Sequence, residues 1–123
     1  MWPEHLSECF DLDSLRTFGG FDEDEAWEFF QELAEAFLDD SPARIQTILS
    51  SIPSGSFDVV KNEAHSLKGS SRNLYAVKLG DLCEALESAS GNSDANSAGR
   101  AAQALAYEFA RVENALNKML EPA

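Results

Sequence analysis

A histidine, a lysine and a glycine lie close together in the segment Ala-His-Ser-Leu-Lys-Gly-Ser-Ser, which spans residues 64–71. If this segment is helical, His65, Lys68 and Gly69 share one face, because residues three and four apart are neighbours on a helix. An apolar stripe on another side of the same helix comprises Val60, Ala64, Leu67, Ser71 and Leu74. We therefore expect the imidazole of His65 at the surface, where a neutral ring nitrogen can attack and carry a phosphoryl group.

Basic residues gather around this histidine, although the formal net charge of the chain is -13. Four of the nine Lys and Arg residues fall in this region, and they are Lys61, Lys68, Arg72 and Lys78. This concentration predicts a local positive patch. Lys68 is expected to place its ammonium near the phosphoryl oxygens and to keep His65 unprotonated by charge repulsion. Ser70 is expected to offer a hydroxyl to the phosphoryl group, whereas Ser71 points towards the core and bonds its own helix backbone.

The sequence resembles the histidine-containing phosphotransfer (HPt) domains of two-component phosphorelays. The resemblance runs from about Asp11 to about Leu120. Its strongest part is His65-Ser66-Leu67-Lys68-Gly69-Ser70-Ser71, followed at helical spacing by Leu79, Cys83 and Leu86-Glu87. One position departs from the family pattern, because Tyr75 stands before Ala76 where the family usually has glycine.

The resemblance implies a phosphorelay intermediate. His65 would accept a phosphoryl group from the aspartate of one receiver domain and pass it to another receiver. The partners would be response-regulator receiver domains, a hybrid histidine kinase, or both, and magnesium is expected on the receiver. We expect no cofactor, no metal and no ATP site in this chain. Docking is expected around Gly69, with Arg72 and Lys61 extending the positive face and with Leu15 and Phe18 of a short N-terminal helix beside it.

Two other classes of protein stay open. The chain could be a P1-type phosphoacceptor domain of a chemotaxis-like kinase, or a non-catalytic helical interaction module in which His65 is incidental. An enzyme is disfavoured, because the sequence has no Gly-rich ATP-binding loop and no second zinc ligand spaced to His65. It also offers no catalytic acid beside His65.

Composition limits the partners. A chain of 123 residues with 44% hydrophobic residues fits one globular domain over residues 1–123, with a core from about 11 to 120. The acidic net charge argues against nucleic acid and anionic lipid, because phosphate-rich surfaces would repel it. Cys9 and Cys83 are far apart in sequence, so we expect a buried free thiol at Cys83 and a reducing compartment. No apolar run approaches the roughly 20 residues that span a bilayer. We expect a cytoplasmic monomer.

Helix signals predominate along the chain, so we predict an all-α fold. A short helix near Leu12–Phe18 begins at Asp11 or Asp13, ends at Gly19-Gly20 and covers one end of a bundle. His5 lies near a terminus that is expected to fray, and no role is assigned to it.

Longer amphipathic segments follow this short helix. The first begins at Asp22 and reaches about Ile52, with a bend near Asp40–Pro42. The next begins at Ser56 or Asp58 and carries His65. Two more helices are expected over about Ala76–Ala89 and Arg100–Leu120, with a surface loop over Ser88–Gly99 between them. Four helices with short connections predict an antiparallel up-and-down four-helix bundle with a short N-terminal capping helix.

Overall fold

The computed structural model describes residues 2–122, and every regular element in this part of the chain is helical. The prediction of an all-α fold is therefore confirmed. Two short 3-10 helices and five α-helices follow one another within these residues, with the bounds η1 Glu4–Glu8, α1 Leu12–Arg16, η2 Phe18–Gly20, α2 Glu23–Ser51, α3 Phe57–Asn73, α4 Val77–Gly91 and α5 Ala95–Leu120.

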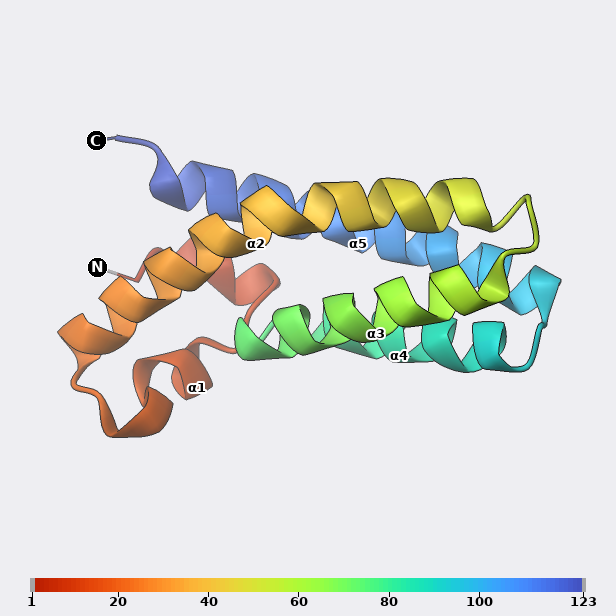
Figure 1. Cartoon of the computed structure of the whole chain (residues 1–123). Coiled ribbons are helices and arrows are strands. Elements are labelled where there is room, and N and C mark those ends of the chain that lie inside the picture. Colours follow the sequence, from red (N-terminus) through yellow and green to blue (C-terminus); the bar gives the residue numbers. More distant parts are fainter. Residues whose placement is uncertain (1, 123) are drawn as a thin grey trace.

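The long helices α2, α3, α4 and α5 run in alternating directions, and each packs against the next along the chain (Figure 1). Helix α2 also packs against α5, which closes the bundle. Residues 11–21, called here the capping segment, lie at the end of the bundle where α2 begins and α3 ends (Figure 1). The antiparallel four-helix bundle with a short capping helix is the predicted arrangement.

Side-chain caps explain where several helices begin. Asp11 accepts a hydrogen bond from the backbone N–H of Ser14 at the start of α1, and Asp22 forms a reciprocal capping box with Glu25 at the start of α2. Each cap satisfies a backbone donor that has no partner inside the helix. Pro42 lies within α2 and cannot donate to the preceding turn, and the axis of α2 changes direction about midway along its length (Figure 1).

The predicted loop over Ser88–Gly99 is wrong. Helix α4 continues to Gly91 and α5 already begins at Ala95, so the connection is only residues 92–94. The side chain of Asp94 accepts from the backbone N–H of Ser97 and starts α5. Small polar residues suggest a loop, but a well-placed cap is enough to begin a helix among them.

The first residues also differ from the prediction. Trp2, Leu6 and Phe10 are buried, and they belong to the same buried cluster as the bundle core. His5 is not in a frayed end, because its Nε2 lies 3.0 Å from the carbonyl oxygen of Ala115 in α5. The core therefore begins at Trp2 and not near residue 11.

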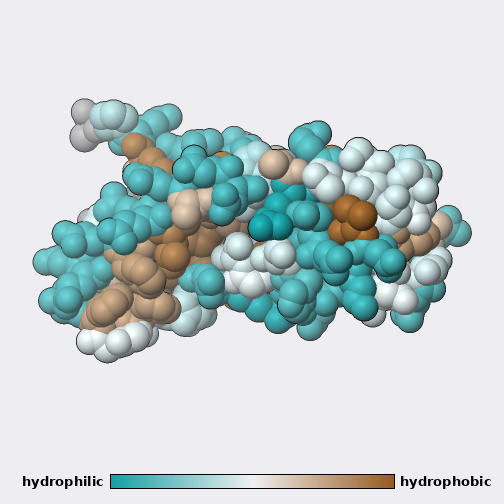
Figure 2. All heavy atoms as spheres, in the orientation of Figure 1, coloured by the Kyte–Doolittle hydropathy of each residue, from teal (hydrophilic) through white to brown (hydrophobic). Residues whose placement is uncertain are grey.

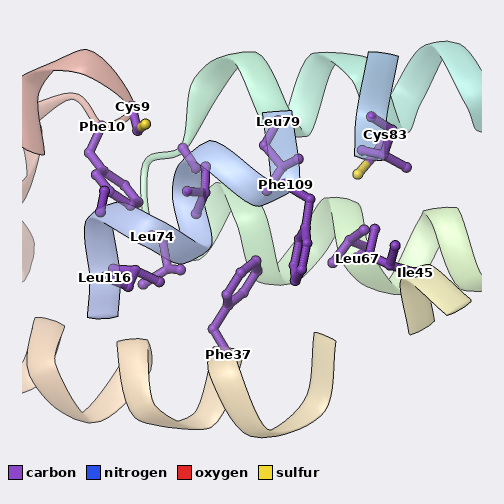
Figure 3. Close-up of a cluster of buried hydrophobic side chains, with 14 of the residues drawn as sticks. Cys9, Phe10, Phe37, Ile45, Leu67, Leu74, Leu79, Cys83, Phe109 and Leu116 are labelled. Atoms are coloured by element: carbon purple, nitrogen blue, oxygen red, sulfur yellow. The ribbon is translucent and has the colours of Figure 1, made fainter. Parts of the chain in front are cut away.

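Buried side chains from all four long helices fill the bundle (Figure 3). Phe37 of α2 and Phe109 of α5 are turned towards each other, with ring centroids 5.7 Å apart. Cys83 of α4 points into the bundle on the side of Leu67, and burial raises the pKa of its thiol to about 12. Cys9 and Cys83 are both free and buried, so the expected buried thiol is confirmed.

One charged residue is buried in this core. Glu108 of α5 is 1% exposed, and its Oε1 accepts a hydrogen bond from the guanidinium of Arg111 at 2.8 Å. The ammonium of Lys78 is 3.9 Å from the same oxygen, while the other carboxylate oxygen has no partner among the described residues. Within residues 2–122, no helix combines the length and the apolar character needed to cross a bilayer.

Candidate functional site

Helix α3 presents His65 on its outer face. The apolar stripe predicted for this helix, from Val60 to Leu74, is completely buried against the other helices. The opposite side of α3 is therefore in solvent, and the side chain of His65 is 67% exposed. Gly69 lies one turn further along, and a Cβ atom added there would meet nothing within 4 Å. The predicted exposure of the imidazole and the open space beside it are both confirmed.

A carboxylate from α4 completes the site. Oε2 of Glu87 is 2.9 Å from Nδ1 of His65, and Oε1 of the same residue is 2.7 Å from Nζ of Lys68. Glu87 thus joins the imidazole and the ammonium from the neighbouring helix. The sequence offers no catalytic acid beside His65, but the structure places this carboxylate next to the imidazole. The signal was present in the Leu86-Glu87 pair, but only the packing of α3 against α4 shows that the carboxylate reaches His65.

The charge of Glu87 is stabilised by its two partners. The ammonium of Lys68, and then the hydrogen bond from His65, hold the pKa of this carboxyl below its ordinary value, against the opposing effect of partial burial. The side chain of Lys68 is only 18% exposed and its ammonium is directed at Glu87. The expected charge repulsion between Lys68 and His65 therefore does not describe this site, because the carboxylate lies between the two groups.

The contact with Glu87 fixes which ring nitrogen can react. A carboxylate accepts hydrogen bonds, so Nδ1 of His65 carries the proton that faces Glu87. In the neutral ring, Nε2 is then the unprotonated nitrogen with a lone pair. Since the imidazole projects from the bundle, Nε2 is the atom that a partner protein can approach.

The predicted positive patch is largely neutralised. Arg72 lies 3.4 Å from Glu84 and 4.0 Å from Asp81, both on α4, and its stem covers Gly80, where an added Cβ would lie 3.1 Å from Cγ of Arg72. Arg72 therefore ties α3 to α4 and does not extend a free positive face.

The other two basic residues of the predicted patch, Lys78 and Lys61, lie in different surroundings. Lys78 is directed at the buried Glu108. Lys61 is exposed, its stem lies beside Gly91, and it forms no ion pair within residues 2–122. Lys61 and Lys68 line an open groove between α3 and α4, together with Glu84 and Glu87.

The two serines after Gly69 point away from His65. Ser71 is buried and its hydroxyl donates to the carbonyl of Leu67 at 2.7 Å, as predicted. Ser70 bonds the carbonyl of Ser66 at 3.3 Å and lines a groove against α2 with Leu33 and Asp40. The sequence predicts Ser70 at the phosphoryl group, and this is wrong, because the residue lies on the side of α3 that faces α2.

Leu15 and Phe18 of the capping segment are both predicted at the docking surface, but only Phe18 lies near it. Leu15 is only 3% exposed, so it supports the core and cannot form part of a docking surface. Phe18 is half-buried and belongs to an aromatic cluster with Phe21, Phe29 and Tyr75, in which neighbouring ring centroids lie 5.3–6.2 Å apart. Phe21 is 40% exposed. Figure 2 shows a hydrophobic surface over α1 and the first half of α2, the region that holds this cluster.

Comparisons with known proteins show which family and which solved structure the chain is similar to. The family model of the Hpt domain matches residues 32–121. The crystal structure of histidine-containing phosphotransfer protein B (HptB) from Pseudomonas aeruginosa PAO1 is similar, with a TM-score of 0.77 and 26% sequence identity. The match covers 90% of this chain and 93% of that chain. No curated protein matches the chain at a significant level.

Proposed function

Because the chain belongs to the Hpt domain family and is thus a phosphotransfer intermediate of phosphorelays, we propose that His65 is the residue that carries the phosphoryl group. The observation that supports this most directly is the hydrogen bond between Nδ1 of His65 and Glu87, at 2.9 Å. It directs the reactive nitrogen of an exposed imidazole into solvent, where a second protein can deliver the group.

Phosphorylation follows from this geometry. The lone pair of Nε2 attacks the phosphorus of an aspartyl phosphate on a receiver domain. A nitrogen–phosphorus bond forms while the bond between phosphorus and the aspartyl oxygen breaks, and the aspartate leaves as a carboxylate. Positive charge develops on the ring, and the carboxylate of Glu87 stabilises it through the proton that stays on Nδ1. No base has to remove a proton from Nε2.

The next transfer reverses these steps. A carboxylate oxygen of the second receiver attacks the phosphorus, and His65 leaves as a neutral imidazole. In this reaction Glu87 is a positioning residue, since it touches the imidazole but neither the phosphorus nor the leaving oxygen. The magnesium ion that receivers use would stay on the partner, and this chain would need no cofactor, metal or ATP site of its own.

Lys68 is proposed to stabilise the phosphoryl group. Its ammonium contacts Glu87, and the same carboxylate accepts a hydrogen bond from the imidazole. Lys68 is therefore close to His65 but does not block Nε2. A phosphoryl group on Nε2 brings negatively charged oxygens that compete with Glu87 for this ammonium. The flexible stem of lysine allows the ammonium to move from the carboxylate to the phosphoryl oxygens.

The partner is proposed to approach over the uncharged side of α3. Towards α4, His65 is flanked by basic residues that are paired with carboxylates. On the side of His65 away from Glu87, four exposed residues of α3 near the imidazole are small and uncharged, and they are Asn62, Ser66, Gly69 and Asn73. This docking face, made of those four residues with Phe18 and Phe21, lets a receiver bring its aspartate close to Nε2. Lys61, at the edge of the α3–α4 groove, can meet an acidic side chain of the partner.

Response-regulator receivers and hybrid kinases are the proposed partners of a monomer in the cytoplasm. The test uses receiver domains of the source organism, phosphorylated with radioactive acetyl phosphate and magnesium. We expect wild-type chain to take up the label, His65→Gln to take up none, and ATP with magnesium alone to label neither. A P1-type domain would be labelled only by a kinase with ATP. Equal labelling of wild type and His65→Gln would refute the assignment of His65.

A further inference from the structure

Tyr75 has an unusual backbone conformation. It lies in the turn between α3 and α4 with φ of 56°, in the left-handed region. A residue with a Cβ is strained there, whereas glycine adopts this conformation freely. Among the described residues, only Ser93 shares this feature without being glycine, with φ of 53° in the turn between α4 and α5. A strained residue persists where surrounding contacts hold it, so the contacts of Tyr75 identify what its side chain supplies.

Tyr75 holds the capping segment at both of its ends. Its carbonyl oxygen accepts a hydrogen bond of 2.9 Å from the backbone N–H of Asp11, the residue that caps α1. Its ring meets the ring of Phe18 edge to face, with centroids 6.2 Å apart and an interplanar angle of 81°. The first contact needs only the backbone, and glycine could make it. The second contact needs the aromatic ring.

Phe18 connects the ring of Tyr75 to an exposed aromatic side chain. Phe18 also packs against Phe29 and Phe21, with centroid distances of 5.3 Å and 5.9 Å, and Phe21 is exposed. Phe21 is 40% exposed and Phe18 is half-buried, so this cluster reaches the surface at the end of the bundle. Tyr75 is therefore the contact through which the end of α3 meets the aromatic side chains of the capping segment.

This surface lies within reach of a partner seated on His65. Tyr75 is six residues beyond Gly69, which corresponds to about 9 Å at the rise of a helix, and its ring centroid lies 6.2 Å from that of Phe18. A typical interface covers about 800 Å² of each partner, a disc of about 16 Å radius. A receiver centred near Gly69 would therefore reach the end of α3, where the ring of Tyr75 meets that of Phe18.

We propose that Tyr75 is a positioning residue for phosphotransfer. Its ring fixes the capping segment against the end of α3, so that Phe18 and Phe21 are held in place as the apolar part of the docking face for the receiver domain. This inference rests on the proposed function for its partner, but the attachment of the capping segment can be measured without any receiver.

The test compares three variants with the wild type. Tyr75→Gly removes the ring and relieves the strained backbone, whereas Tyr75→Phe keeps the ring. Ser93→Gly relieves the same kind of strain in a turn that does not touch the capping segment, and it is the matched control. Circular dichroism first establishes that each variant is folded at the assay temperature.

The first measurement is limited trypsin cleavage after Arg16, the last residue of α1. We expect faster cleavage in Tyr75→Gly than in wild type, Tyr75→Phe or Ser93→Gly, because its capping segment is no longer held by the ring. The second measurement is binding of, and transfer from, a phosphorylated receiver domain. Loss of one interface anchor weakens binding by about fivefold or more, and we expect this loss in Tyr75→Gly alone.

The outcomes separate the two proposals. Wild-type cleavage at Arg16 in Tyr75→Gly would overturn the attachment of the capping segment by Tyr75. Faster cleavage with unchanged receiver binding would overturn its part in docking and leave Tyr75 a purely structural residue. A wild-type chain that no receiver labels would refute the proposed function itself, and with it the docking part, while the cleavage result would still decide whether Tyr75 holds the segment.

Discussion

Replacing Glu87 with glutamine should slow phosphoryl transfer much more than it destabilises the bundle. The amide keeps the size of the side chain and can still accept a hydrogen bond from Nδ1 of His65, but it removes the negative charge that stabilises the charged ring. A hydrogen bond to a charged group contributes about 1.5–3 kcal/mol. If this stabilisation is realised in the transition state, its loss slows transfer by about 10- to 150-fold.

The effect on stability should be smaller. The imidazole of His65 is mostly exposed, and an exposed ion pair contributes about 0.2–1 kcal/mol. Lys68 is only 18% exposed, but glutamine can still accept a hydrogen bond from its ammonium. Losing the contacts of Glu87 with His65 and Lys68 should therefore cost about 1 kcal/mol, or a decrease in Tm of about 3–6 °C for a chain of this size.

The stability difference should also depend on pH. The pKa of Glu87 is lowered in the folded chain, first by Lys68 and then by His65. The unfolded chain therefore binds more protons at acid pH, and stability rises with pH in that range. The contribution of Glu87 should be complete above the ordinary carboxyl pKa of about 4.3 and should disappear as the pH falls through the lower folded value. Glu87→Gln should lack this dependence.

Glu84→Gln is the control for this experiment. Glu84 lies one turn before Glu87 on α4 and pairs with Arg72 at 3.4 Å, so its replacement also removes an ion pair between α3 and α4, but none with His65. Transfer rates from a phosphorylated receiver and thermal denaturation are measured for both variants. Equal transfer rates in Glu87→Gln and Glu84→Gln would refute the argument that Glu87 acts on the imidazole.

Three further changes test separate parts of the structure. Lys68→Ala should slow transfer or shorten the lifetime of the phosphorylated form by less than the roughly tenfold of a full charge-assisted contact, because Lys68 exchanges its contact with Glu87 for the phosphoryl oxygens; a time course quenched in alkali would measure it, and an unchanged course would exclude this contact. Gly69→Gln should raise stability by about 0.5 kcal/mol through better helix propensity and yet obstruct docking, since an added side chain meets only solvent; a lower Tm with intact transfer would contradict this. Arg111→Met should lower Tm because the buried charge of Glu108 loses its closest partner, whereas Glu108→Leu should be neutral or stabilising, and the opposite order in thermal denaturation would show that the pair stabilises the fold.

The helices that could be predicted from the sequence are those set by short-range interactions. The spacing of Val60, Ala64 and Leu67 defines the buried side of α3, and this spacing alone places His65 in solvent. The capping residues Asp11 and Asp22 also act within one turn of their own helices. The sequence does not predict the start of α5, because the small polar residues before Arg100 are typical of loops, whereas in the structure Asp94 caps the helix.

The site could be predicted only as far as one helix determines it. The basic residues of α3 are evident in the sequence. Whether their positive charge is neutralised depends on the carboxylates of α4. Glu87 follows His65 by 22 residues and reaches it only because the two helices pack side by side. The same packing brings Glu84 to Arg72. A count of cations along one helix therefore overestimates the positive field at the site.

This pairing bears on how firmly the site would hold a phosphoryl group. A lysine without a partner would give phosphohistidine the full benefit of a charge-assisted contact, about 1.5–3 kcal/mol. Lys68 must first give up a contact of 2.7 Å with Glu87, so the net gain is only the difference between two contacts of the same kind. A small net gain keeps the energies of the phosphorylated and free forms close together. An intermediate that must receive a group from one aspartate and release it to another needs this balance, and we propose that the carboxylate on α4 contributes to it.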